Sequence, residues 1–112
     1  MKVIYVAGPF RGKNAWEVEQ NVRRAETFAM MLAEKGFMPL CPHSNTRFFD
    51  GTLTADFWVK GTLELMRRCD GVMVCDTEQG ALWQASTGTC GEVEEAKRLG
   101  LPVRFAGDKL DF

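Results

Sequence analysis

The sequence lacks the ligand patterns of common metal sites. None of its four cysteines forms a Cys-x-x-Cys pair, and His43 is its one histidine. Structural and catalytic zinc sites draw on several such side chains at short spacings, so the sequence argues against a zinc protein. The cysteines lie in apolar or helical contexts, which is typical of reduced and mostly buried thiols.

Long apolar runs and an excess of one charge are also missing. The N-terminal apolar run, residues 3–7, is too short for a signal peptide, and no run approaches the length of a membrane span. The 14 basic and 15 acidic residues are interspersed, a balance that is not typical of proteins that bind nucleic acids or anionic membranes. We therefore expect a cytoplasmic protein with neither nucleic acid nor membrane as a partner.

What the sequence does contain is a regular alternation of strands and helices within one domain over residues 1–112. The pattern predicts strands over 2–7, 37–41, 71–76 and 101–105, and helices over 15–35, 56–69 and 91–99. Residues 42–54 are expected to form a long loop, and residues 77–84 an irregular loop with an exposed Trp83. Such alternation favours a parallel sheet with right-handed crossovers.

Ligands of parallel sheets bind beyond the carboxyl ends of the strands. This rule brings residues 8–11, 43–47 and 76–92 to one rim of the predicted sheet. These segments are also the ones that look least like core, so we expect the ligand there.

The segment Ser86 to Glu92 is expected to form a loop that leads into the last helix. The small residues Ser86 and Gly88 leave room for a ligand against the N–H groups of a helix start. Glu92 is expected within or near the first turn, where the helix dipole favours the charged form of a nucleophile or an orienting group. The alternative is that Glu92 only stabilises the helix start and Ser86 only caps it.

The segment Gly8 to Asn14 differs from a P-loop. It has three residues between its glycines and no Ser or Thr after the lysine, which argues against nucleoside-triphosphate hydrolysis. What remains is a turn with Arg11, either a group that captures phosphate or carboxylate or a solvated surface arginine. His43 is interpreted as a loop hydrogen-bonding residue rather than a catalytic base. Tyr5 is a core residue whose buried hydroxyl needs a partner.

Five segments together resemble the nucleoside 2-deoxyribosyltransferase superfamily, closest to a branch of small bacterial and phage proteins and similar also to the 2-deoxynucleoside 5′-monophosphate N-hydrolases. They are residues 4–12, 41–43, 69–72, 86–92 and 100–103. The most specific part combines Ser-x-Gly-x-x-x-Glu with Tyr-x-x-Gly-x-x-Arg-Gly. The resemblance implies a flavodoxin-like three-layer α/β sandwich with a parallel sheet of four or five strands.

The resemblance also implies roles for individual residues. Glu92 would be the nucleophile at C1′ of the sugar, and Tyr5 would orient its carboxylate. The substrate-binding residues would be Gly8, Pro9, Phe10, Arg11, His43, Thr62, Ser86 and Gly88. The reaction would need no cofactor or metal, and the chain would form a homodimer or a higher homo-oligomer.

One position departs from the family pattern. Relatives carry an aspartate eight positions before Asp70 that assists departure of the base, and this sequence has Thr62 there. A threonine hydroxyl is a poor general acid. Asp56 and Asp76 are the nearby candidates to replace it. The resemblance therefore implies cleavage or transfer of the N-glycosidic bond of a small-molecule substrate, a nucleoside or nucleoside 5′-monophosphate. The alternative is a catalytically weakened nucleotide-binding or sensing module.

Overall fold

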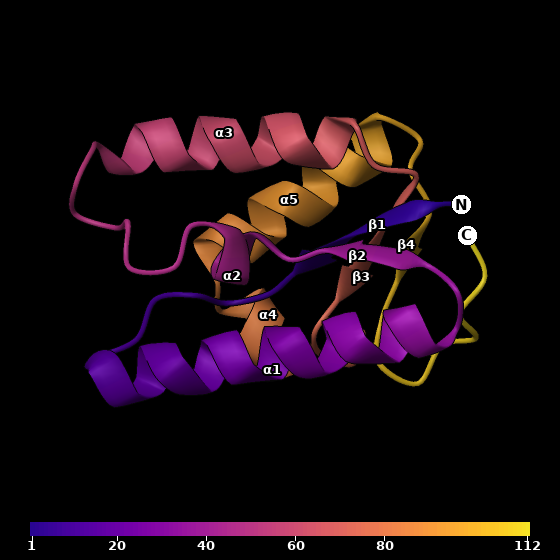
Figure 1. Cartoon of the computed structure of the whole chain (residues 1–112), viewed down its shortest axis with the longest axis horizontal. Coiled ribbons are helices and arrows are strands. Elements are labelled where there is room, and N and C mark those ends of the chain that lie inside the picture. Colours follow the sequence, from indigo (N-terminus) through magenta and orange to yellow (C-terminus); the bar gives the residue numbers. More distant parts are fainter.

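The computed structural model describes residues 1–112 and contains four strands and five helices (Figure 1). The strands are β1 (Val3–Ala7), β2 (Met38–Leu40), β3 (Gly71–Val74) and β4 (Val103–Arg104). The helices are α1 (Ala15–Glu34), α2 (Pro42–Asn45), α3 (Ala55–Arg67), α4 (Ala81–Gln84) and α5 (Thr87–Arg98). No helix combines the length and apolar character that crossing a membrane requires.

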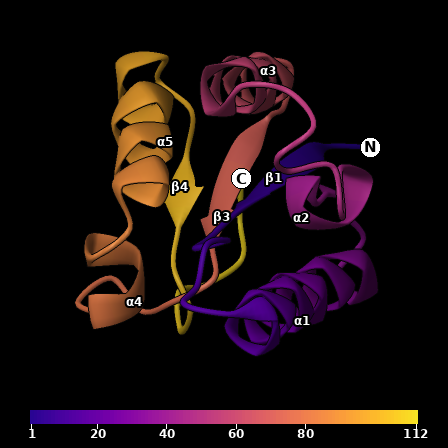
Figure 2. The ribbon, with the colours of Figure 1, turned by 90° about the vertical axis from the view of Figure 1, so that its left-hand side faces the viewer.

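All strands are parallel, in the order β2-β1-β3-β4. This order is that of a flavodoxin-like sheet, so the predicted fold class is confirmed with four strands. Helix α1 covers one face of the sheet, and α3 and α5 cover the other (Figure 2).

The core divides into two layers because successive side chains of a strand point to opposite faces. Ile4 and Val6 of β1 pack toward α1, with Leu32 among their neighbours. Tyr5 and Ala7 face the other layer, where α3 and α5 contribute Met66, Val93 and Ala96. The alternation along β1 therefore places the Tyr5 hydroxyl on the side of α3 and α5.

Helix α1 begins and ends where local signals predict. Asn14 caps it by accepting a hydrogen bond from the Glu17 N–H at 2.9 Å, and the Glu17 carboxylate accepts in return from the Lys13 N–H at 2.9 Å. After Lys35, Gly36 has φ of +91°, a left-handed conformation that favours glycine.

Helix α3 is capped by Thr54, whose hydroxyl accepts from the Phe57 N–H at 3.2 Å. Gly61 lies in its middle and is exposed, with nothing within 4 Å of the position where a Cβ would stand. The packing of α3 within the chain therefore gives no reason for a glycine at this position.

The structure corrects the prediction in three segments. The expected loop over 42–54 opens with α2, which Pro42 starts because its fixed φ suits a first helical position. The expected irregular loop over 77–84 contains α4. Trp83, expected to be exposed, is half-buried, and its ring centroid lies 5.3 Å from that of Phe105. Helix α5 starts at Thr87 and not near Gly91, so Gly88 lies within it.

Candidate active site

The candidate site lies beside the two central strands at their carboxyl ends. In flavodoxin-like sheets the strand order reverses between β1 and β3, and ligands bind in the crevice at that point. Here Ala7 at the end of β1 is paired with Val74 at the end of β3. The segments that follow these two strands, 8–11 and 75–86, carry several of the residues that the sequence singles out.

The central feature of the site is a hydrogen bond between Tyr5 and Glu92. The Tyr5 hydroxyl donates to Oε2 of Glu92, joining β1 to α5. Tyr5 is fully buried and Glu92 is half-buried. The partner that the sequence requires for the Tyr5 hydroxyl is therefore the carboxylate of Glu92.

Burial dominates the electrostatics of this pair. Removal of the Glu92 carboxyl from solvent raises its pKa to about 7, and the hydrogen bond from Tyr5 opposes part of that rise. Burial, followed by the proximity of Glu92, raises the pKa of Tyr5 well above its ordinary value, so the hydroxyl stays protonated as a donor. Glu92 accordingly titrates near neutral pH.

This environment corrects the predicted electrostatics of Glu92. Glu92 is the sixth residue of α5 and lies in the second turn, because the helix begins at Thr87. The dipole effect falls off within the first turn, so it gives little support to the charged form. Desolvation instead favours the neutral form of the carboxyl, and that effect is the larger one.

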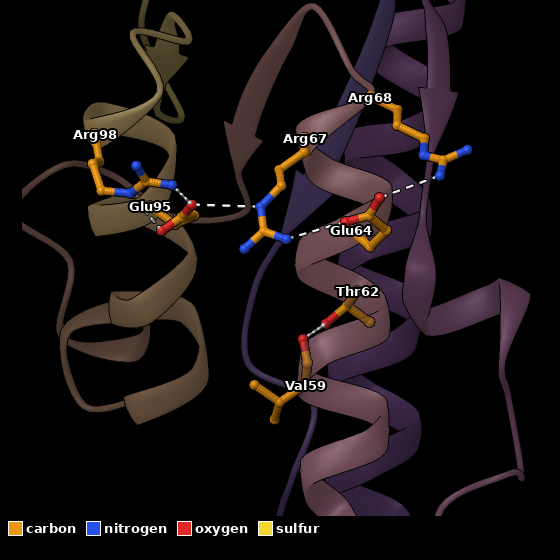
Figure 3. Close-up of polar contacts among 7 residues, drawn as sticks. All are labelled: Val59, Thr62, Glu64, Arg67, Arg68, Glu95 and Arg98. Carbon is orange, nitrogen blue, oxygen red and sulfur yellow. Dashed lines mark hydrogen bonds and ion pairs between the residues drawn. The ribbon is translucent and has the colours of Figure 1, made fainter.

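Thr62 lies on α3 beside the pair. It is half-buried, and its hydroxyl donates to the Val59 carbonyl at 3.1 Å (Figure 3). The same hydroxyl lies close enough to Tyr5 to lower the Tyr5 pKa against the larger effects of burial and Glu92. Thr62 is thus an α3 residue next to the Tyr5 hydroxyl.

One ion pair joins α3 to α5 at their surface. Arg67 of α3 contacts Glu95 of α5 at 3.5 Å, and Arg98 pairs with the same carboxylate (Figure 3). Arg67 also contacts Glu64 within α3 at 3.1 Å. This network connects the helix that carries Thr62 with the helix that carries Glu92.

Ser86 and Gly88 are at the start of α5. The Ser86 hydroxyl caps the helix by accepting from the Thr89 N–H at 3.2 Å. Gly88 is exposed, and nothing lies within 4 Å of the position where its Cβ would stand. Gly88 and Glu92 are four residues apart on one helix, so they share a face. The surface at Gly88, one helical turn before Glu92, is therefore open.

The turn Gly8 to Arg11 leaves β1 toward α1. A Cβ on Gly8 would stand 3.2 Å from the Cβ of Cys75, so the close approach of β1 and β3 favours glycine here. Arg11 is exposed. His43 is buried on α2, where Nε2 bonds to the Pro9 carbonyl at 2.9 Å and the ring contacts Phe10 edge-on at 5.4 Å. Burial lowers the pKa of His43, which favours the neutral imidazole.

The two aspartates considered as alternative acids are engaged elsewhere. Asp56 is exposed and pairs with Lys60 at 3.0 Å. Asp76 accepts from the Thr77 N–H at 2.8 Å and from the Trp83 N–H at 3.1 Å, which fixes the segment before α5. Neither contact brings a carboxyl to the Tyr5–Glu92 pair.

Two further features were not predicted from the sequence. Asn21 on α1 donates to the carbonyls of Phe10 and Arg11. A cavity of about 310 Å³ lies between α1 and the segment after α2, and among its lining residues are Phe10, Val18, Arg47 and Phe48. The cavity shares Phe10 with the predicted binding residues but does not reach Glu92. The structure gathers no group of three or more His, Cys, Asp or Glu side chains that could hold a metal ion.

The sheet order and the Tyr5–Glu92 pair define a flavodoxin-like α/β protein with a buried carboxyl beside the switch point. Within this class, the chain belongs to the family described as a domain of unknown function, DUF7768, whose model matches residues 2–106. No curated protein matches the chain.

Several solved structures share the fold. A 2-deoxyribosyltransferase from Bacillus psychrosaccharolyticus has 23% identity and a TM-score of 0.64, over 97% of this chain and 77% of that one. A 2-deoxyribosyltransferase from Leishmania mexicana has 22% identity and a TM-score of 0.64, and the match covers 94% of this chain and 63% of that one. A CMP N-glycosidase from Clostridium botulinum has 21% identity and a TM-score of 0.60, and the match covers 93% of this chain and 70% of that one. These matches confirm the fold expected from the resemblance.

Proposed function

We propose that the protein cleaves or transfers the N-glycosidic bond of a nucleoside or a nucleoside 5′-monophosphate, with Glu92 as the nucleophile. The observation that carries this proposal is the buried Tyr5–Glu92 hydrogen bond beside the switch point of the sheet. The sequence resemblance to the nucleoside 2-deoxyribosyltransferase superfamily supports it. So do the activities of the structural neighbours, which are deoxyribosyl transfer and N-glycosidic cleavage.

The proposed chemistry follows that of retaining glycosidases. An oxygen of ionised Glu92 bonds to C1′ while the C1′–N bond breaks, and the base leaves with the electron pair and takes up a proton from solvent. The ester is then opened by water, or by the nitrogen of a second base in a transfer reaction. No metal or redox cofactor takes part in this scheme.

Tyr5 orients the nucleophile in this scheme. A hydroxyl that donates to one carboxylate oxygen leaves the other oxygen free to attack, and it restricts rotation of the side chain. The pKa of Glu92, about 7, provides enough of the ionised form near neutral pH while leaving the carboxylate only weakly solvated. Ser86, Gly88 and the Gly8–Arg11 turn are proposed to bind the sugar and, where present, the phosphate.

The alternative function is a catalytically weakened module that binds or senses a nucleotide. Thr62 favours it, because this α3 residue next to the Tyr5 hydroxyl carries a hydroxyl and not a carboxyl. The engagement of Asp56 and Asp76 in other contacts also favours it. Under this alternative the same site binds the ligand without turnover.

We also propose that the chain forms a homodimer or a larger homo-oligomer through α3 and the segment before it. Apolar side chains are exposed there: Phe48, Phe49, Leu53, Phe57 and Val59. Asp56 and Lys60 are exposed beside Phe57, and two antiparallel copies of α3 would place opposite charges side by side. Light scattering after size exclusion tests this, with Phe57→Ser expected to weaken the assembly; a monomeric parent protein at micromolar concentration would contradict it.

The test of the function measures base released from a panel of deoxynucleosides and their 5′-monophosphates by chromatography. Glu92→Ala should abolish release without unfolding the chain, because it removes one carboxyl and no apolar core volume. Glu94→Ala is the matched control, since Glu94 is an exposed glutamate on the same helix. Unchanged release by Glu92→Ala would remove Glu92 from the mechanism.

Binding is tested separately on the parent protein. A nucleotide that binds the native state raises the melting temperature with its concentration. A shift in melting temperature without release of base would favour the sensing module. If no nucleoside or nucleotide at millimolar concentration produced either a shift or calorimetric heat, the assignment of the site would fail.

A further inference from the structure

Three successive backbone carbonyls of the turn after β1 are held by side chains from two helices. Nδ2 of Asn21 on α1 donates to the Phe10 carbonyl at 3.0 Å and to the Arg11 carbonyl at 3.1 Å. Nε2 of His43 on α2 bonds to the Pro9 carbonyl at 2.9 Å. Because a carbonyl oxygen only accepts, this nitrogen of His43 carries the proton. The carbonyl side of the turn is thus fixed to α1 and α2.

The orientation of the Asn21 carboxamide is determined by its partners. Nη1 of Arg24 donates to Oδ1 of Asn21 at 2.9 Å. A guanidinium has only donors, so the amide oxygen must face Arg24 and the amide nitrogen must face the turn. Asparagine is a poorer helix former than leucine, glutamate or lysine, so helix stability does not explain its presence in the interior of α1. The three hydrogen bonds do explain it.

The hydrogen bonds to the three carbonyls also fix the direction of the N–H groups in the same peptide planes. In a trans peptide the C=O and N–H groups point in opposite directions. The N–H groups of Phe10, Arg11 and Gly12 share peptide planes with the three held carbonyls, so they point away from Asn21 and His43. None of these three N–H groups donates a hydrogen bond within the chain. The turn therefore presents successive free donors next to the exposed Arg11.

We propose that Asn21 is a positioning residue that aims these donors and Arg11 at the anionic part of a nucleotide. Successive backbone N–H groups on one side of a turn are suited to anions. The ligand in this inference rests on the proposed function. We call the hydrogen bonds from Asn21 and His43 to the three carbonyls the clamp, and the clamp can be tested without any ligand. His43 is the second member of the clamp, which gives this buried residue a role other than that of a catalytic base.

The clamp is tested first by native-state trypsin cleavage. Asn21→Asp keeps the size of the side chain and the acceptor for Arg24 but removes both donors to the turn. We expect cleavage after Arg11 to accelerate at least about fivefold, because local opening no longer has to break these bonds. Cleavage after the exposed Lys109 is the internal reference, and Gln20→Ala is the control on the same helix. Asn21→Ala repeats the test without an added charge.

The positioning role is tested by kinetics on the same proteins. We expect Asn21→Asp and Asn21→Ala to raise KM for a deoxynucleoside 5′-monophosphate at least about tenfold, and KM for the matching nucleoside less. The kcat should stay within about threefold of the parent value, since Tyr5 and Glu92 lie on β1 and α5. Leu32→Val in the buried part of α1 is the control for a general loss of stability. In this variant, KM for the nucleotide should not rise more than KM for the nucleoside.

The outcomes separate the clamp from the proposed function. Unchanged cleavage after Arg11 in both folded Asn21 variants would overturn the clamp. Faster cleavage with an unchanged KM, or an equal rise of KM for nucleotide and nucleoside, would overturn the positioning role. A parent protein that binds no nucleotide would refute the proposed function and with it the ligand of this inference, while the cleavage rates would still decide whether Asn21 holds the turn.

Discussion

The hydroxyl of Tyr5 on β1 donates to the carboxylate of Glu92 on α5, across 87 positions of the sequence. The contact joins β1, one of the two central strands, to the helix that follows the Ser86 cap. It also places a carboxyl of raised pKa beside a donor that stays protonated. The predictions below follow from this pair and its neighbours.

The first prediction concerns the pH dependence of the reaction. A nucleophilic Glu92 must be ionised, and burial raises its pKa to about 7. The kcat/KM for base release should therefore rise about tenfold per pH unit below this value and level off above it. The measurement is a pH–rate profile from pH 5 to 9. An inflection at the ordinary value for a glutamate would show that another group, or a solvated Glu92, limits the rate.

The second prediction concerns stability and its sign. The pKa of Glu92 is about 7 in the folded state and 4.5 in its reference state, so the folded protein binds more protons between these values. The contribution of Glu92 to stability is present below pH 4.5 and is lost as pH rises through 7. Glu92→Gln, which stays neutral, should therefore gain stability over the parent by up to about 3 kcal/mol at pH 8.

Urea unfolding of the two proteins at pH 4 and at pH 8 measures this difference. Comparison of the two proteins cancels the titration of all other carboxyls. Equal differences in the free energy of unfolding at both pH values would mean that Glu92 is not desolvated in the folded state.

The third prediction concerns Tyr5→Phe. Loss of the hydroxyl removes the hydrogen bond that lowers the Glu92 pKa, so the pH–rate inflection should move upward. The kcat/KM at pH 7 should fall about tenfold or more, since a hydrogen bond to a charged group is worth about 1.5–3 kcal/mol. A lower rate without movement of the inflection would point to a packing defect at this buried position.

The fourth prediction concerns Thr62→Asp. A carboxyl beside the pair would protonate the leaving base, and general acid catalysis contributes about 10²–10⁴ in rate. We expect base release at least about tenfold faster than in the parent, with Thr52→Asp in the exposed loop as the charge control. Fast turnover in the parent that Thr62→Asp leaves unchanged would mean that another acid serves the base. Nucleotide binding without turnover in either protein would favour the sensing module.

Local signals predicted much of the fold. The alternation of apolar strands and amphipathic helices predicted the parallel sheet, and Asn14 and Gly36 marked the ends of α1 correctly. The start of α5 was misplaced because Gly88 and Gly91 weaken the helical pattern there. Helix α2 was missed because one turn is too short to show a periodicity.

The site was harder to predict because its properties come from tertiary contacts. The sequence identified Tyr5 and Glu92, and the structure brings them together, but their catalytic roles stay predictions. The raised pKa of Glu92 depends on burial by elements distant in sequence, so a helix-position argument gave the opposite sign. Asn21 was missed because one polar residue on an amphipathic helix has the pattern of any solvent-facing position.

Within a single chain, the open space around Gly61 allows a substitution that should stabilise α3. Gly61 is exposed in the interior of α3, and no atom lies within 4 Å of the place where a methyl group would stand. Alanine is more favourable than glycine in a helix interior by about 0.5–1 kcal/mol, partly because it restricts the unfolded chain. Gly61→Ala should raise the melting temperature by a few degrees in a scanning calorimeter without changing KM. Gly61→Ala would therefore be a more stable background in which to test substitutions that destabilise the fold.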